Sequence, residues 1–162
     1  MAVVFGFAGS KFYIGGPKTF SQSDLTASSF TGETWVEVQG IESIGEFGDQ
    51  AQYGSFTALG DRRTTRFLSM FEGSDFQISM ARNIADPGQS ELRDAGLDPG
   101  TNYAFKIEYD DAPPGGTPSQ DMFIGLVSPL RRSGGTNTDA LKWVASIATN
   151  SNIVEIAPAP AP

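Results

Sequence analysis

The feature that most constrains the fold is a strict alternation of apolar and polar side chains along several short stretches. From 103 to 109, Tyr103, Phe105, Ile107 and Tyr109 alternate with smaller or polar residues, and the same period of two recurs over 76–80. Successive side chains of a β-strand point to opposite faces, so this pattern predicts strands with one face buried. The chain is therefore expected to be mainly β.

Further apolar stretches are also strand candidates, and about seven or eight strands are expected among all the candidates. They cover residues 3–7, 11–14, 35–38, 53–59, 64–70, 122–127, 142–149 and 153–156. Residues 122–127 are apolar on both faces, which predicts a central strand. A β-sandwich or flattened barrel is the simplest fold for these strands, because the apolar face of each strand has to be buried against another layer. Uncapped strand edges favour pairing with another copy of the chain.

One short helix is predicted to flank the sheet. Asp86 can cap its start, Pro87 suits the first helical position, and Gln89 stands where a capping-box partner would. The pattern ends near Gly96. We expect this helix to cover one face of the sheet.

At 162 residues the chain is long enough for one domain, which we place at 1–156. Residues 19–32 are rich in Ser and Thr and are either a mobile surface loop or an arm that orders against a neighbouring subunit. The anchors of such an arm would be Phe20, Leu25 and Phe30. The Ala-Pro tail, 157–162, is expected to be disordered because proline cannot donate to a strand ladder.

Composition narrows the function. The chain has no histidine and no cysteine, which removes the commonest general base and metal ligands, so neither an enzyme nor a cofactor or metal site is expected. A formal charge of −8 opposes ordinary nucleic-acid binding. The apolar start, Met1–Ala8, is a poor signal peptide, and no stretch is long enough to span a bilayer. We expect synthesis in the cytoplasm.

Three small constellations allow a chemical and a structural interpretation. Asp61-Arg62-Arg63 could bind phosphate, but a turn with surface or intersubunit ion pairs is favoured. Asp110-Asp111 could bind calcium or act as paired glycosidase carboxylates, but adjacent acids point apart, which favours loop solvation. Trp35 and Trp143 could stack on sugars, but they lie within strand patterns, which favours burial.

Seven segments, taken in order and spacing, carry a family resemblance. They are 32–38, 41–48, 59–63, 86–92, 103–107, 123–127 and 153–156. They resemble the major tail tube protein of long-tailed, lambda-like, non-contractile bacteriophages, and the resemblance covers roughly residues 12–156. It implies a mainly β fold, a sandwich or barrel flanked by a helix, whose edges are completed by oligomerisation into a ring.

The resemblance also implies a structural role. Copies would form stacked homohexameric rings in the virion tail, with tape-measure, terminator and distal tail proteins as further partners. Genomic DNA would pass through the bore without specific binding, since a wall rich in carboxylates offers phosphates no attraction. The alternatives are a tail terminator or secretion-tube ring protein, and a secreted carbohydrate-binding β-sandwich.

Site residues follow from the predicted strand faces. The candidates for the lumen or outer wall lie opposite the core-facing positions and are Glu37, Gln39, Gln77, Ser79, Lys106 and Glu108. Ring-to-ring contacts are expected from 19–32 and from the Gly-rich, acidic loop 45–52. The candidate intersubunit residues are Phe20, Leu25, Phe30, Glu46, Asp49, Asp61, Arg62 and Arg63.

Overall fold

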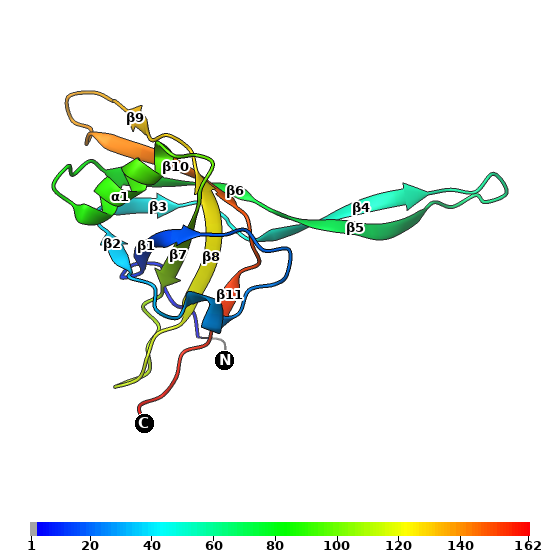
Figure 1. The fold of residues 1–162 in the computed structure, drawn as a ribbon, viewed down its shortest axis with the longest axis horizontal. Coiled ribbons are helices and arrows are strands. Elements are labelled where there is room, and N and C mark those ends of the chain that lie inside the picture. Colours follow the sequence, from blue (N-terminus) through cyan, green and yellow to red (C-terminus); the bar gives the residue numbers. More distant parts are fainter. Residues whose placement is uncertain (1–2) are drawn as a thin grey trace.

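The computed structural model describes residues 3–162 and shows a curled antiparallel sheet with a long hairpin leaving it (Figure 1). Met1 and Ala2, which the predicted domain and the predicted start segment include, lie outside the described residues. The strands are β1 (Lys11–Lys18), β2 (Val36–Val38), β3 (Ile41–Ile44), β4 (Asp49–Phe56), β5 (Thr65–Gly73), β6 (Asp75–Ala81), β7 (Asn102–Glu108), β8 (Gln120–Val127), β9 (Arg131–Ser133), β10 (Lys142–Thr149) and β11 (Val154–Ile156). The helices are the 3-10 turn η1 (Ala27–Phe30) and α1 (Pro87–Gly96).

The main sheet has the order β2-β1-β7-β8-β10-β6-β3, with β11 also paired to β8 and β9 to β10. Its two outermost strands, β2 and β3, are consecutive in the chain and are joined at Gln39 and Gly40. The chain bends there with Gly40 at a φ of 76°, a backbone conformation that glycine adopts without a steric penalty. The connection therefore brings the two ends of the sheet together, and the predicted mainly β fold with a sandwich or barrel body and one short α-helix is confirmed.

The main core lies inside the curl and is built around stacked phenylalanine rings. Phe123 has its ring centroid 5.5 Å from that of Phe105 and 5.6 Å from that of Phe76. The alternating positions of the strands supply the rest, and the inward-facing residues include Phe12, Ile14, Val38, Ile78, Met80, Ile107, Val127, Trp143, Ala145 and Ile147. The inward face predicted for the alternating stretches is thus the buried face.

A second, smaller core lies on the other side of β7 and β8. Ala104, Met122 and Ile124 are buried there against Phe30 and Val154. Strand β8 is therefore buried on both faces, as its two-sided apolar sequence predicts. The cover for this face comes from η1, the segment around it and β11.

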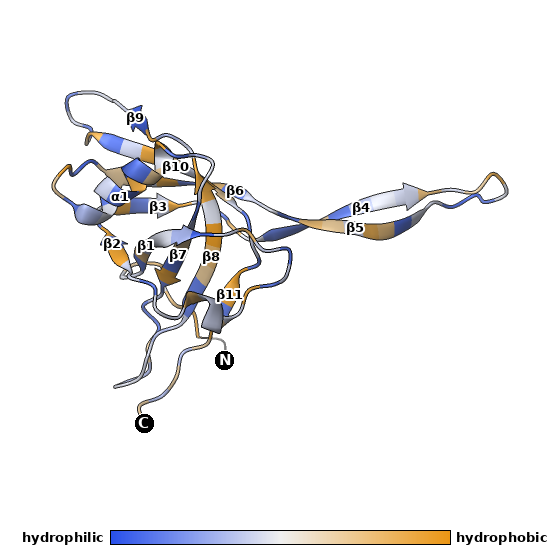
Figure 2. Cartoon of the chain, in the orientation of Figure 1, coloured by the Kyte–Doolittle hydropathy of each residue, from blue (hydrophilic) through white to orange (hydrophobic). Residues whose placement is uncertain are grey.

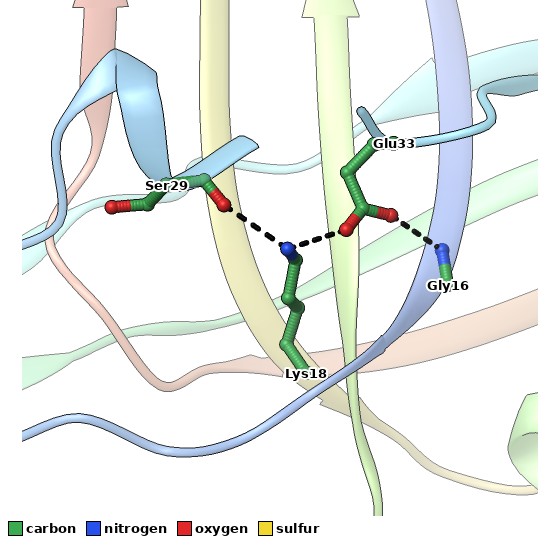
Figure 3. Close-up of polar contacts among 4 residues, drawn as sticks. All are labelled: Gly16, Lys18, Ser29 and Glu33. Carbon is green, nitrogen blue, oxygen red and sulfur yellow. Dashed lines mark hydrogen bonds and ion pairs between the residues drawn. The ribbon is translucent and has the colours of Figure 1, made fainter. Parts of the chain in front are cut away.

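Residues 19–35 fold back onto their own chain. Lys18 forms an ion pair with Glu33 and donates a 3.0 Å hydrogen bond to the Ser29 carbonyl, while the Gly16 N–H donates to Glu33 at 2.9 Å (Figure 3). Farther along, the Leu25 N–H donates to the Asn152 side chain at 2.7 Å. This arrangement differs from both expectations for 19–32, a mobile surface loop and an arm that orders against a neighbouring subunit.

Helix α1 begins and ends where the sequence predicts. Asp86 is the N-cap and accepts a 2.8 Å hydrogen bond from the Gln89 N–H, but the Gln89 side chain does not complete a capping box. Fully buried, it accepts from the Asn83 N–H and donates to the Gln39 and Ala81 carbonyls, at 2.8 to 2.9 Å. Gln89 thereby ties the helix to both sides of the Gly40 bend, where unpaired backbone groups need partners.

Three sequence predictions are corrected. No strand forms over 3–7, where the apolar side chains are exposed and no strand edge pairs with them. Residues 131–133, which lie outside every predicted strand, form β9 because their backbone pairs with β10. In the tail expected to be disordered, Ala159 pairs with Thr117, since alanine keeps the N–H that the neighbouring prolines lack.

Candidate assembly surface

The β4–β5 hairpin stands apart from the rest of the molecule. It forms its own two-stranded sheet, and Figure 1 shows it projecting as a long arm from the body. The predicted strands at 53–59 and 64–70 form, but the expectation that one face of each is buried is wrong, because almost every hairpin side chain is exposed. Strand β4 also starts at Asp49, so the expected loop 45–52 is shorter than predicted.

The exposed hairpin is apolar. Figure 2 shows hydrophobic stretches along β5 and at the tip. Its exposed apolar side chains are Tyr53, Phe56, Leu59, Phe67, Leu68, Met70 and Phe71. Monomeric proteins rarely leave such a continuous apolar surface in water, and a surface of this kind marks a contact with another protein.

Both faces of the hairpin mix apolar with polar side chains. The register shifts between Gln52 and Tyr53, where β5 has one extra residue, and the side chains of β4 alternate between the two faces. One face carries the pairs Ala51 with Phe71, Tyr53 with Leu68 and Ser55 with Arg66. The other face carries Gln50 with Glu72, Gln52 with Met70 and Gly54 with Phe67, and the Phe67 ring lies over Gly54, where a Cβ would overlap it. Each face therefore has large apolar side chains that are suited to burial.

An isolated two-stranded hairpin is only marginally stable in water. Within residues 3–162 neither β4 nor β5 pairs with a third strand, so the outer N–H and C=O groups of both are open. Open edges and unburied apolar side chains are two separate features that contacts with other chains would satisfy.

The hairpin tip carries the Asp61-Arg62-Arg63 cluster. The Asp61 N–H donates a 3.0 Å hydrogen bond to the Ala58 carbonyl, which closes the turn. All three side chains are exposed, and within residues 3–162 none of them forms an ion pair. The predicted turn is confirmed, and the expected ion pairs of this cluster stay a prediction about contacts between subunits.

The six wall candidates do not share one surface. Glu37, Lys106 and Glu108 lie on the outer face of β2 and β7, next to the second core. Lys106 is mostly covered, with its Nζ 4.3 Å from the centre of the Tyr13 ring and 3.8 Å from the Glu108 carboxylate. Its charge is thus held by an aromatic face and an acid, which makes it a poor wall residue.

Gln77 and Ser79 lie elsewhere, on the outer face of β6. They stand opposite Ser146 and Val144 of β10, and no element of the described chain lies over them. The Ser79 hydroxyl donates to Glu42, which also forms an ion pair with Lys142 at 2.8 Å. The sixth candidate, Gln39, sits at the Gly40 bend, where its backbone N–H donates to Asp86.

The intersubunit candidates are also divided. Phe30 is buried in the second core and Leu25 packs against it, so neither is available to a neighbouring chain. Phe20 stays exposed at the base of the hairpin, next to Asp49. Glu46 is exposed in the short segment that leads into β4.

The remaining constellations have structural roles. Trp143 is buried in the main core, and Trp35 packs on Phe30 with ring centroids 6.3 Å apart, so neither offers a flat exposed surface to a sugar. Asp111 accepts hydrogen bonds from the Ser119 hydroxyl and N–H, which lower its pKa. Asp111 therefore braces its loop, whereas the sequence favoured a role in solvation of that loop.

One acid outside these clusters has an altered environment. Burial raises the pKa of Asp121, the Glu155 charge raises it further, and the hydrogen bond from the Tyr109 hydroxyl, 2.6 Å long, opposes both. Burial and the same hydrogen bond raise the pKa of Tyr109. Tyr109 therefore stays protonated and holds the end of β7 to β8.

Residues 3–162 contain no group of three or more Asp, Glu, His or Cys residues placed to hold a metal ion. In the same range no helix has the length and apolar character needed to cross a membrane.

Sequence reasoning missed the apolar side chains of the hairpin. Phe67, Leu68, Met70 and Phe71 occupy both strand faces, because apolar residues fall on odd and even positions of β5. This two-sided pattern was the signal that distinguishes β5 from a half-buried strand, because a half-buried strand has apolar residues only at every second position.

The comparisons with known proteins agree on the fold. No protein-family model and no curated protein matches the sequence. The chain superposes on a protein of the anti-feeding prophage (AFP) baseplate with a TM-score of 0.64 and 8% identity, over 97% of this chain and 98% of that one. The chain superposes on the SPP1 tail tube with a TM-score of 0.60 and 11% identity, over 91% of this chain and 76% of that one. On the tail of an empty gene transfer agent (GTA) particle it superposes with a TM-score of 0.58 and 13% identity, over 90% of this chain and 96% of that one. The chain thus has the fold of phage tail-tube and baseplate proteins.

Proposed function

We propose that this chain is the structural subunit of a bacteriophage tail tube or of the tube of a phage-derived particle. Copies form hexameric rings, the rings stack, and genomic DNA passes through an acidic bore. The observation that carries the proposal is the β4–β5 hairpin, which is apolar, exposed and open at both edges. Such an element is incomplete in one copy and is completed when copies join.

The shared fold supports this role. Two of the matched structures are described with six-fold or C6 symmetry, and two are tails or tail tubes. A ring of copies supplies partners for the open strand edges, and closing a sheet on itself removes those edges altogether. Such a subunit has a mechanical role, in which it makes the tube stiff and gives it a smooth inner wall.

We assign the bore to the outer face of β6 and β10. This face carries polar side chains, among them the exposed Gln77 and the half-buried Ser79 and Ser146. The Arg131 side chain donates to the Ser146 hydroxyl at 3.3 Å on the same face. Strand β5 passes into β6 through Ser74, so the hairpin extends this part of the sheet. By contrast, Glu37, Lys106 and Glu108 stand beside the covered second core and are assigned to the outer part of the wall.

An overall charge of −8 suits a conduit for DNA. Carboxylates repel phosphates within about 10 Å at moderate salt, so DNA can move without being held. The expected partners are further copies of the chain, then the tape-measure, terminator and distal tail proteins. The site of action is the virion tail, after synthesis in the host cytoplasm.

A baseplate or tube-end ring is the second candidate, favoured by the AFP baseplate match over nearly the whole of both chains. Electron microscopy of the purified protein over a concentration series separates the two. A tube subunit gives long tubes or stacks of rings, and a tube-end protein gives single rings at every concentration. A chain that stays monomeric throughout contradicts both roles.

The bore assignment has its own experiment, because the cysteine-free sequence allows single cysteines to be introduced cleanly. Gln77→Cys in assembled tubes should react with a small maleimide and resist one attached to a globular carrier protein. Before assembly it should react with both. Equal labelling of assembled tubes by the carrier-bound reagent would place β6 on the outside, and Glu108→Cys provides the comparison position.

A further inference from the structure

The apolar segment that precedes β1 is left uncovered by the folded chain. Val3, Val4 and Phe5 are 74%, 90% and 60% exposed. Residues 3–6 contain no charged side chain and are rich in residues that favour strands, yet they pair with no strand within residues 3–162. Exposed apolar side chains that lie next to one another mark a contact with another protein surface.

An open strand edge and an apolar pocket both belong to β3. Within residues 3–162 this strand pairs only with β6, so its other edge is free. The pocket has a volume of about 310 Å³, and its only acid, Glu42, is already paired with Lys142. Its apolar lining consists of Phe7, Ala8, Phe12, Ile41 and Ile44. The pocket is therefore suited to an uncharged, apolar side chain.

The uncovered segment and the open edge have matching lengths. Residues 3–6 and β3 each have four residues, which span about 13 Å at about 3.3 Å per residue. A segment that adds to a sheet edge gains affinity from its backbone hydrogen bonds, and gains specificity from the alternate side chains that enter pockets. In such a strand Val3 and Phe5 point to the same side, and Val4 points to the other.

The turn after the segment directs it away from its own pocket. The Phe7 ring packs edge-on against Tyr109, with ring centroids 6.1 Å apart, and the Phe7 carbonyl accepts a 3.2 Å hydrogen bond from the Ser10 N–H. Phe7 and Ala8 already form part of the pocket wall. Residues 3–6 would have to reverse direction at Phe7 to enter it, whereas an extended segment is free to reach a second copy.

We propose that residues 3–6 of one copy form a strand on the open edge of β3 in the next copy, a contact that rests on the proposed assembly of copies. The Phe5 ring enters the pocket beside Ile44. Both surfaces are uncharged and apolar, and each lacks the kind of partner that the other offers. The contact joins two unlike surfaces, so it is head-to-tail and can continue around a ring.

Mixed single-cysteine chains test the contact directly, because the sequence contains no cysteine. A Phe5→Cys chain mixed with a tagged Ile44→Cys chain should give a disulfide-linked heterodimer under mild oxidation. Only a contact between copies can form this product. The matched control is Phe5→Cys mixed with tagged Ile156→Cys, which should give little heterodimer. Ile156 is another half-buried isoleucine, but it lies on β11 beside the second core.

Self-association provides a second test. Phe5→Ser should leave unfolding in urea unchanged, because the ring is exposed in a single copy. It should raise the protein concentration at half assembly by about tenfold to a hundredfold, the effect of removing one buried ring from a contact. Leu97→Ser is the matched control, since Leu97 is 74% exposed and lies at the end of α1, and it should leave assembly unchanged.

The outcomes separate this contact from the tube role. If the wild-type chain forms tubes while no heterodimer appears and Phe5→Ser assembles like wild type, the contact is wrong and the tube role stands. A specific heterodimer from a chain that never forms rings or tubes supports the contact and contradicts the tube role. If the wild-type chain stays monomeric and no heterodimer forms, both are contradicted. As much heterodimer with Ile156→Cys as with Ile44→Cys, or equal loss of assembly from Leu97→Ser, would also overturn the contact.

Discussion

The body of the molecule and its hairpin are made of the same kind of antiparallel ladder but differ in what surrounds it. In the body, Phe123 is fully buried between other rings, whereas Phe71 of the hairpin is 67% exposed. Each net backbone hydrogen bond contributes about 1 kcal/mol, while ordering one residue costs about 1 to 2 kcal/mol. Backbone hydrogen bonds between two strands are therefore not enough to offset the entropy that is lost when the strands become ordered. The body gains the difference from its core, and in the proposed tube the hairpin gains it from neighbouring copies.

The largest loss of stability should come from the centre of the body. Phe123→Ala removes a ring that touches Phe47, Phe76 and Phe105, and should lower the free energy of unfolding by about 3 to 5 kcal/mol in urea titrations. Phe71→Ala in the hairpin should change it by less than about 0.5 kcal/mol. Similar losses for both would erase the distinction between the two regions.

The next effect should come from the bend that closes the body. Gln89→Ala leaves three backbone groups without partners and should cost about 2 to 4 kcal/mol, again by urea titration. The control is Gln39→Ala, at an exposed neighbour for which only backbone hydrogen bonds are seen. If the two variants are equally stable, the bend is not held by Gln89.

A smaller, pH-dependent effect is expected at Asp121. Burial raises its folded pKa, so the folded chain binds this proton more tightly than the unfolded chain does. The resulting stability is present below the unfolded pKa and is lost as pH rises through the folded one. Asp121→Asn should therefore be more stable than wild type near about pH 7, with the gain shrinking toward about pH 3. A gain independent of pH would rule out ionisation as its cause.

The smallest effect on folding should accompany a complete loss of assembly. Phe67→Ser with Phe71→Ser removes one exposed ring from each face of the hairpin and should leave the unfolding free energy within about 0.5 kcal/mol of wild type. The same variant should remain monomeric in sedimentation velocity at concentrations where wild type forms rings or tubes. Tubes of normal length from this variant would show that these rings are not part of an interface.

The body could be predicted from sequence because its signals are local. The alternation at 103–109 and 76–80, the two-sided apolar run at 122–127 and the cap at Asp86 each depend on neighbouring residues, and the structure has all four features. The second core was not predictable in this way. Nothing local indicates that Phe30 packs against Ala104, because the two are brought together only by the folded sheet.

The hairpin shows the limit of the same reasoning. Residues 53–59 and 64–70 carry strand signals, and strands do form there, but periodicity gives the secondary structure without giving the partner. The prediction of the wall residues was limited in the same way. Alternation of apolar and polar residues distinguishes inward-facing from outward-facing positions of a strand. It does not tell whether an outward side chain, such as that of Lys106, is covered by another segment.

The central claim, that the hairpin is completed by other copies, is tested most directly by amide hydrogen exchange of 49–73 in dilute monomer and in assembled protein. We predict fast exchange along β4 and β5 in the monomer and strong protection after assembly, with the body protected in both states. Equal protection of the hairpin in the two states, or fast exchange that persists in the assembled protein, would contradict the account.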